Sequence, residues 1–347
     1  ITTGSNDHVA LMVYAHTHTD ILFFSSYGTV YRLRGYQIPD AARDGKGIPA
    51  INLLNLDQEE KIVAIVPCDD YPEDNYLFFC TVNGVVKRVS LKLFESIHSN
   101  GKRALGLKDG DMLLDVKRTD GHAIISLASN NGKVCSFNED EVRAMGRDAS
   151  GVKGMNLDDG SHLVGITSSL EGDRILVLSK QGQGKISYAK DTDIPQEDGS
   201  VRHYDGYRLT SRGAKGVISL KVTDKGGELY AMKAVRGDED LMVVTNKGIV
   251  IRMPIDQIKV AGRNTQGVKI LALEKGQYVA SIAILPHADE SVEEVADNTD
   301  DEINPALVKE NEESVEAKEK VVTPDDVDEI DEDASSEDDI SSGKDDL

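Results

Sequence analysis

The chain repeats one pattern five times, and this repetition restricts the fold more than any other feature of the sequence. Each copy is an aliphatic run, a short polar turn that ends in glycine, and a second β-rich run with basic residues. β-Forming residues on both sides of a glycine turn predict a β-hairpin in every copy. The five predicted hairpins occupy residues 21–33, 76–89, 123–137, 174–188 and 241–253.

The glycines at the five predicted turns are almost evenly spaced. They are Gly28, Gly84, Gly132, Gly182 and Gly248, separated by 56, 48, 50 and 66 residues. The last interval is long because residues 196–207 have the character of an inserted loop. A repeat of about 50 residues has room for four strands, which is the size of a propeller blade.

A loop rich in glycine and lysine follows each hairpin and leads into an alternating apolar run. These Gly/Lys loops lie at residues 43–47, 100–103, 150–154, 211–216 and 264–267. A repeat is therefore predicted to contain a hairpin, a connector, a Gly/Lys loop and another strand pair.

The two ends of the array predict further blades. Residues 263–285 have the loop and strands of a repeat without a following hairpin, and residues 1–18 resemble the strand half of another. We therefore expect an all-β fold of six blades in residues 1–286, with the first blade incomplete and its hairpin upstream of Ile1.

Almost all of the net negative charge of the chain lies in its C-terminal segment. Residues 287–347 contain 25 Asp or Glu against 4 Lys or Arg, which leaves 36 acidic and 35 basic residues in 1–286. The acidic segment holds no aromatic residue and no sustained apolar period, so we predict a disordered acidic tail at 287–347. The net charge of −22 thus says little about what the repeats bind.

Other classes of function find little support. The three cysteines form no C-x-x-C pair, and no leader or long apolar run is present, so a disulfide framework, zinc site, export and membrane insertion are not expected. His16 and His18 share a strand face but lack further ligands, and residues 181–185 lack the phosphate-loop spacing. No catalytic set and no cofactor site is predicted within the chain.

The Gly/Lys loops are the best candidates for binding, because each carries basic residues beside glycines that permit close backbone approach to phosphate. Three hairpin arginines, each four residues after a turn glycine, would face the same way in their blades. If blades form a ring, these positions recur around its rim, as bent duplex DNA requires. The predicted DNA-binding residues are Arg32, Arg43, Lys46, Arg88, Lys102, Arg103, Arg147, Lys153, Arg208, Arg212, Lys215, Arg252, Arg263 and Lys269.

The array resembles the C-terminal domain of the A subunit of DNA gyrase, a bacterial type II topoisomerase. The resemblance runs from about residue 7 to residue 285, and its most specific stretches are residues 17–31, 36–56, 142–155, 212–222 and 260–268. It implies a six-bladed β-pinwheel that wraps double-stranded DNA around a basic outer edge, so that the whole enzyme introduces negative supercoils.

The resemblance also implies what lies outside the chain. The catalytic tyrosine and the ATPase, with their ATP and Mg, would belong to the N-terminal region of gyrase A or to the B subunit of an A2B2 enzyme. This fragment would then be non-catalytic, and its location the bacterial cytoplasm at the nucleoid.

One departure keeps an alternative open. The basic heptapeptide Gln-Arg-Arg-Gly-Gly-Lys-Gly of the family does not occur here, and by register it would lie just upstream of Ile1. Its true absence would favour the A subunit of topoisomerase IV, which mainly relaxes and decatenates DNA. A propeller-type scaffold for protein partners is a further alternative, although it would not explain the recurrent basic loops.

Overall fold

The computed structural model describes residues 11–41, 47–196 and 198–287 of the chain. These residues form strands and five short 3₁₀ helices, and none of them lies in an α-helix. The all-β prediction is therefore confirmed. The predicted disordered tail lies outside the described residues, apart from His287.

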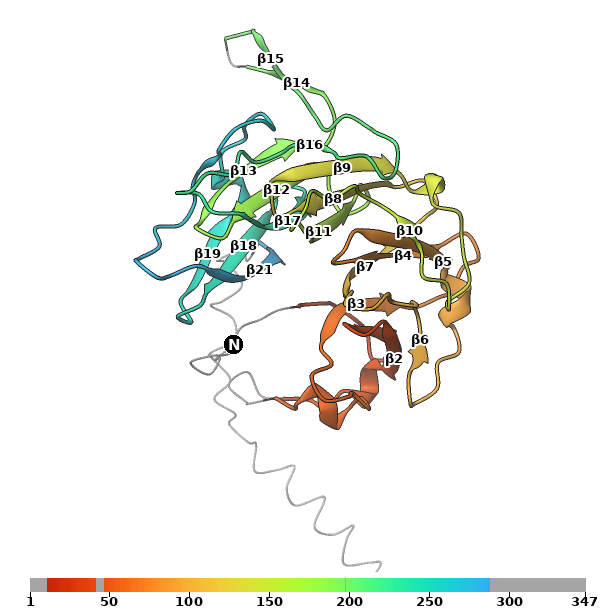
Figure 1. Cartoon of the computed structure of the whole chain (residues 1–347). Helices are drawn as coiled ribbons and strands as arrows, with labels where there is room; N and C mark the ends of the chain where they lie inside the picture. The colour runs from red at the N-terminus through yellow and green to blue at the C-terminus, as the bar shows by residue number, and fades with distance from the viewer. Residues whose placement is uncertain (1–10, 42–46, 197, 288–347) are drawn as a thin grey trace, which may run out of the picture. The chain divides into compact units, whose positions relative to one another are not determined.

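Five of the six sheets that the described strands form follow one another around a common centre, and these five are named blades 1 to 5 in chain order (Figure 1). From the centre outward, blade 1 contains β3 (Ile62–Cys68), β1 (Asp20–Ser25), β2 (Thr29–Arg34) and β6 (Lys102–Arg103). Blade 2 contains β7 (Leu113–Thr119), β4 (Tyr76–Thr81), β5 (Val85–Ser90) and β10 (Val152–Lys153). Blade 3 contains β11 (Leu163–Ser168), β8 (Ile124–Ser129), β9 (Lys133–Asn138) and β16 (Val217–Ile218). Blade 4 contains β17 (Leu229–Val235), β12 (Arg174–Ser179), β13 (Gln183–Tyr188) and β20 (Val268–Lys269), and blade 5 contains β21 (Val279–Pro286), β18 (Glu239–Thr245) and β19 (Val250–Pro254).

The direction from centre to edge follows from contacts between blades. The first strand of each blade contacts the first strand of the next, from β3 to β7, β11, β17 and β21. These strands therefore surround the centre, and the last strand of each blade lies at the outer edge. The 3₁₀ helices are η1 (Gly35–Gln37), η2 (Ala50–Asn52), η3 (Leu91–Phe94), η4 (Glu139–Glu141) and η5 (Ile255–Gln257).

All five predicted hairpins are present as antiparallel strand pairs in the middle of the blades. The five predicted turn glycines have φ angles between +76° and +83°, which is the left-handed region that glycine adopts without steric penalty. Local turn chemistry therefore predicted the hairpins correctly. The predicted insertion is also a hairpin, formed by β14 (Thr192–Pro195) and β15 (Val201–Tyr204), and it extends away from the blades (Figure 1).

The division of repeats into blades differs from the prediction, because none of the four-stranded blades consists of one repeat. The outermost strand of each four-stranded blade comes from the Gly/Lys loop that follows the next hairpin along the chain. Thus β6 follows the hairpin of blade 2 but pairs with β2 of blade 1, and β10, β16 and β20 are exchanged in the same way. Periodicity alone does not reveal this exchange, since it joins segments more than 60 residues apart.

The prediction of six blades with an incomplete first blade is wrong for the described residues, which form five blades. The prediction treated residues 263–285 as the start of another blade, but β20 completes blade 4 and β21 completes blade 5. Blade 1 has four strands, and blade 5 has three. Of the other half-repeat, residues 11–18 contain no strand and residues 1–10 lie outside the described part.

The core lies between blades rather than within them. One cluster joins Phe24 of blade 1 to Phe79 of blade 2, and another joins Phe78 of blade 2 to Phe137 of blade 3. Two further clusters join blades 3 and 4 and blades 4 and 5. Because both faces of a blade are buried, the middle strands are continuous apolar runs rather than alternating ones.

The three-stranded blade 5 leaves apolar side chains exposed. Val30, Val86 and Val134, each two residues after a turn glycine, are at most 1% exposed beneath the exchanged strand. The corresponding Val250 is 50% exposed, because no strand of the described residues pairs with the outer edge of β19. The exchanged strand thus completes the burial of each hairpin as well as its hydrogen bonding.

This difference predicts unequal effects of the same substitution. We expect Val134→Ala to lower the free energy of unfolding by about 2 kcal/mol, the value of a buried valine side chain. Val250→Ala should change it by less than about 0.5 kcal/mol, as exposed positions do. Urea denaturation of both variants measures the difference, and equal losses would contradict the burial assigned to the exchanged strand.

Candidate nucleic-acid interface

Four of the five predicted Gly/Lys loops form the outer edge of blades 1 to 4, and the first, at residues 43–47, lies almost entirely outside the described residues. Each of the four loops belongs to a segment that runs along the outer hairpin strand of the preceding blade, and we call these segments straps. Isolated parallel bridges join Ala144 to Arg88, Leu209 to Ser136 and Val260 to Ile186, so that the straps of blades 2 to 4 follow the strands that they cover. The straps comprise residues 95–103, 142–153, 205–218 and 258–269.

A glycine at the start of each exchanged strand permits this close contact. These strap glycines are Gly101, Gly151, Gly216 and Gly267, all with positive φ. A Cβ atom on Gly151, Gly216 or Gly267 would lie 2.5 Å from a backbone carbonyl oxygen of the hairpin. Glycine is therefore required here for backbone-to-backbone packing, a role that was not predicted from the sequence.

Basic side chains recur at two fixed distances from the strap glycine, and each of the two positions is basic in three straps. Four residues before it stand Arg147, Arg212 and Arg263, and two residues after it stand Lys153 and Lys269, with Arg103 in the strap of blade 1. The position two residues after the glycine is exposed in every strap. In blade 3 Ile218 occupies it, and the exposed Lys215 lies directly before the glycine.

The structure adds two basic residues that the sequence analysis missed. Arg143 and Lys259 stand eight residues before their strap glycines, as the predicted Arg208 does, and all three are exposed. Each directly precedes the residue that bridges to the hairpin. The fixed spacing of eight residues was the signal available in the sequence.

The basic residues of the straps lack acidic partners. Among the described residues, none of the predicted strap residues makes an ion pair with a carboxylate; they are Lys102, Arg103, Arg147, Lys153, Arg208, Arg212, Lys215, Arg263 and Lys269. Several donate to backbone oxygens instead, for example Lys102 to Ser96 and Arg212 to Lys153. Their positive charge is therefore not neutralised by direct ion pairs.

The hairpin arginines differ in this respect. Arg32 lies 3.4 Å from Asp20, and Arg252 lies 2.6 Å from Asp240. Arg88 is only 9% exposed, lies 3.7 Å from the buried Glu139 and stacks over the ring of Tyr76. These three arginines carry ion pairs within the protein, so their DNA contacts stay a prediction with less geometric support. Arg43 and Lys46 lie outside the described residues.

Two buried lysines lie directly beneath the straps, and the sequence analysis did not select them. Lys87 and Lys185 are 0% exposed and stand three residues after a turn glycine. Burial lowers the pKa of Lys87 to about 8 and that of Lys185 to about 7. A lysine inside an aliphatic strand was the available signal.

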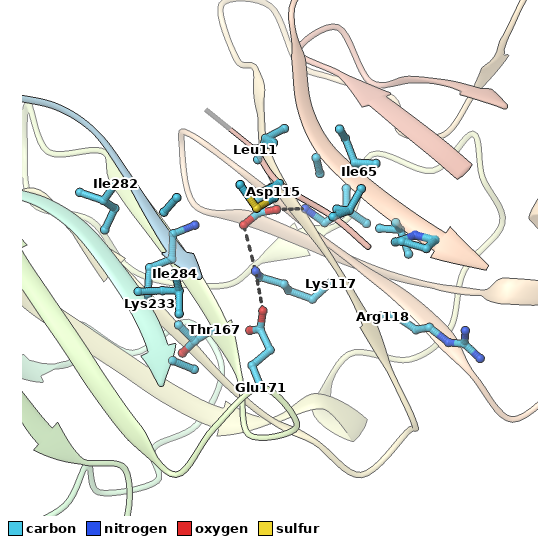
Figure 2. Close-up of a pocket in the computed structure, with 18 residues that line it drawn as sticks. Leu11, Ile65, Asp115, Lys117, Arg118, Thr167, Glu171, Lys233, Ile282 and Ile284 are labelled. Atoms are coloured by element: carbon cyan, nitrogen blue, oxygen red, sulfur yellow. Dashed lines mark hydrogen bonds and ion pairs between the residues drawn. The ribbon is translucent and has the colours of Figure 1, made fainter. Parts of the chain in front are cut away.

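The centre of the blades offers a different kind of site. A cavity there is lined by the inner strands, and Lys117 lies in it between Asp115, at 3.3 Å, and Glu171, at 2.8 Å (Figure 2). The two carboxylates raise the pKa of Lys117 despite its burial, whereas burial lowers the pKa of the nearby Lys233. Because Glu171 follows β11 and Lys117 lies on β7, the ion pair between them connects neighbouring blades, whereas Asp115 lies on β7 beside Lys117.

The histidines considered from the sequence do not gather ligands. His16 and His18 are exposed, and neither belongs to a cluster of three metal-ligating side chains within the described residues. The cluster of this kind that the described part contains is Asp191, His203 and Asp205, at the inserted hairpin, and all three are exposed. Exposed acidic groups of this sort commonly occur without a metal ion.

Comparison with known proteins identifies the fold and the family. The DNA gyrase C-terminal domain, beta-propeller, matches residues 19–69, 75–120, 124–169, 205–236 and 239–286, which together exceed half of the chain. The solved C-terminal domain of DNA topoisomerase IV is 23% identical with a TM-score of 0.68, over 85% of this chain and 84% of that one. A solved DNA gyrase A C-terminal domain is also 23% identical, with a TM-score of 0.65, over 82% and 89%. At this identity the two structures support the fold alone.

Curated relatives agree with the family match. The DNA gyrase A subunit of Ureaplasma parvum is 44% identical over 86% of this chain and 34% of that protein. Its counterpart in Mycoplasma pneumoniae is 38% identical over 87% of this chain and 34% of that protein. This chain spans about a third of the length of these relatives. In the described residues, no helix is long and apolar enough to cross a membrane. The repeats, the exchanged strands and the sequence matches together place the chain in the family of DNA gyrase C-terminal domains.

Proposed function

We propose that this chain binds double-stranded DNA along the straps, without sequence preference, and bends the DNA around the outer edge of the blades. The proposal rests on the basic residues of the straps. They recur from blade to blade and make no ion pair with a carboxylate in the described residues. Phosphates recur regularly along a duplex, so a repeated row of cations can contact them in succession. Bending the duplex costs on the order of a few kcal/mol, which these contacts would offset.

In the parent enzyme, this wrapping would support ATP-dependent negative supercoiling. The chain would act as a binding part of a gyrase whose catalytic tyrosine and ATPase, with ATP and Mg, lie on other regions. Its partners would be DNA, the N-terminal region of gyrase A, and the B subunit, in the bacterial cytoplasm. The proposal rests on the family and on the 44% identity to a gyrase A subunit.

A role in topoisomerase IV is the second candidate, because the C-terminal domains of both enzymes share this fold. That similarity is at 23% identity, well below the identity to gyrase A subunits. DNA wrapping distinguishes a gyrase role from a topoisomerase IV role. For a gyrase role, we expect a defined change in the linking number of relaxed plasmid that a topoisomerase closes in the presence of the chain. A protein scaffold would leave the plasmid unchanged.

The strap charges predict a salt-dependent affinity. We expect the triple variant Arg103→Gln, Lys153→Gln and Lys269→Gln to bind a duplex of about 150 bp, one persistence length, more weakly than the parent chain. The slope of log affinity against log salt should fall by about 3, since each phosphate contact contributes about 0.9. Fluorescence anisotropy across a salt series measures both quantities.

A matched control removes the same charge elsewhere. Lys92, Lys180 and Lys247 are exposed or half-buried lysines that each pair with a glutamate. Their triple replacement by glutamine should leave the salt slope close to that of the parent chain. Equal effects of the two triple variants would mean that net charge, rather than the straps, determines binding.

The acidic segment predicts a second effect on binding. Residues 287–347 carry 25 acidic against 4 basic residues, so a tethered segment of this charge would compete with DNA for the straps. Deletion of the residues after Pro286 should therefore raise DNA affinity, most strongly at low salt, or change the degree of wrapping. Unchanged affinity and unchanged plasmid linking number would leave the segment a role in solubility alone.

A further inference from the structure

Lys87 and Lys185 occupy the same place in blades 2 and 4. Each stands three residues after the turn glycine, on the outer hairpin strand, and each is 0% exposed. The equivalent residues of blades 1, 3 and 5 are Tyr31, Cys135 and Ile251. The fold therefore accepts aromatic, thiol and aliphatic side chains at this position and does not require a charge there.

Both lysines donate to the strap that covers their own blade, and Lys87 also donates to Ala104, which directly follows β6. The Lys185 amino group donates hydrogen bonds to the carbonyl oxygens of Gly262 and Arg263. The Lys87 amino group donates to the carbonyl oxygen of Ala104 at 2.9 Å and to that of Arg147. Each lysine thus holds the backbone of the arginine that stands four residues before its strap glycine.

The neighbourhood of Lys185 contains positive charge without a counter-charge. Arg263 makes no ion pair with a described carboxylate, and its Nε atom is buried without a hydrogen-bond partner in the described residues. Burial and the charge of Arg263 both act against protonation of Lys185. Around Lys87, the carboxylate of Asp148 favours protonation more than the charge of Arg147 opposes it. A bound phosphate would supply the negative charge that the Lys185 and Arg263 pair lacks.

The lysines are unfavourable for stability. Removing an ammonium group from water costs several kcal/mol, and the hydrogen-bond partners of these two amino groups are backbone carbonyl oxygens rather than a carboxylate. Residues whose burial lowers stability in this way are expected at positions where function requires them. Here the geometry supplies a reason, since no apolar side chain could hold the strap carbonyls.

We infer that Lys87 and Lys185 are positioning residues, which fix Arg147 and Arg263 on the outer edge so that each arginine can contact a DNA phosphate. The inference rests on the proposed function. It predicts that stability and DNA affinity respond in opposite directions when the buried amino group is removed. It also predicts that each lysine acts through its own arginine.

The experiment is a double-mutant cycle on the full chain, with Lys185→Met, Arg263→Ala and the double variant. We expect Lys185→Met to retain or raise the urea midpoint of unfolding. It should weaken binding to the same duplex by about fivefold to tenfold, within the range of coupled neighbours. In the Arg263→Ala background, Lys185→Met should have almost no further effect on affinity. The pair Lys87→Met and Arg147→Ala repeats the test in blade 2.

Lys180→Met is the matched control, because it removes one positive charge from blade 4 without touching the strap. Its effect on affinity should be less than about twofold, as expected for a lysine already paired with a carboxylate. Additive losses in the cycle, or an equal loss in Lys180→Met, would overturn the positioning role. Absence of DNA binding by the parent chain would instead contradict the proposed function itself.

Discussion

The contact between each strap glycine and the preceding hairpin is the interaction on which the rest of the structure depends. It brings two backbones so close that a Cβ atom on Gly216 would lie 2.5 Å from the carbonyl oxygen of Val134. The contact closes the outer edge of a blade, buries the valine after the turn and joins consecutive repeats. Because the strap comes from the next repeat, every blade is also a link between repeats, and the loops that carry the basic residues are held against a sheet.

This arrangement separates two kinds of positive charge. Arginines on the hairpins meet Asp20, Glu139 and Asp240, and they stabilise the blades from within. Basic residues on the straps face outward and form no ion pair with a described acid. The near balance of charge in residues 1–286 therefore conceals a patterned surface, in which acids neutralise the hairpins and leave the straps positive. Net charge could not have distinguished these two sets, because it counts them together.

The glycine turns made the hairpins predictable from the sequence, whereas the strand composition of the blades could not be predicted from it. A glycine with φ near +80° leaves a clear sequence signature, so all five turns were found from the sequence. The exchange of strands depends on which hairpin edge a two-residue strand such as Val152–Lys153 reaches, and no local signal records that choice. The predicted strap residues were assigned to the wrong blade, and four that were expected on loops lie on the exchanged strands, namely Lys102, Arg103, Lys153 and Lys269. Lys87 and Lys185 were missed because their partners, Arg147 and Arg263, are distant in sequence.

The same exchange explains the apolar residues that stay exposed at the two ends of the array. Ile51 stands four residues after Gly47, a position where Leu105, Met155, Leu220 and Leu271 are each 2% exposed, yet Ile51 is 58% exposed. At the other end, Val250 is 50% exposed where Val30 is fully buried. An uncovered strand edge beside apolar side chains favours pairing with another strand. Within the described residues, no hairpin covers Ile51 as hairpins cover its four counterparts, and no strap covers the outer strand of blade 5.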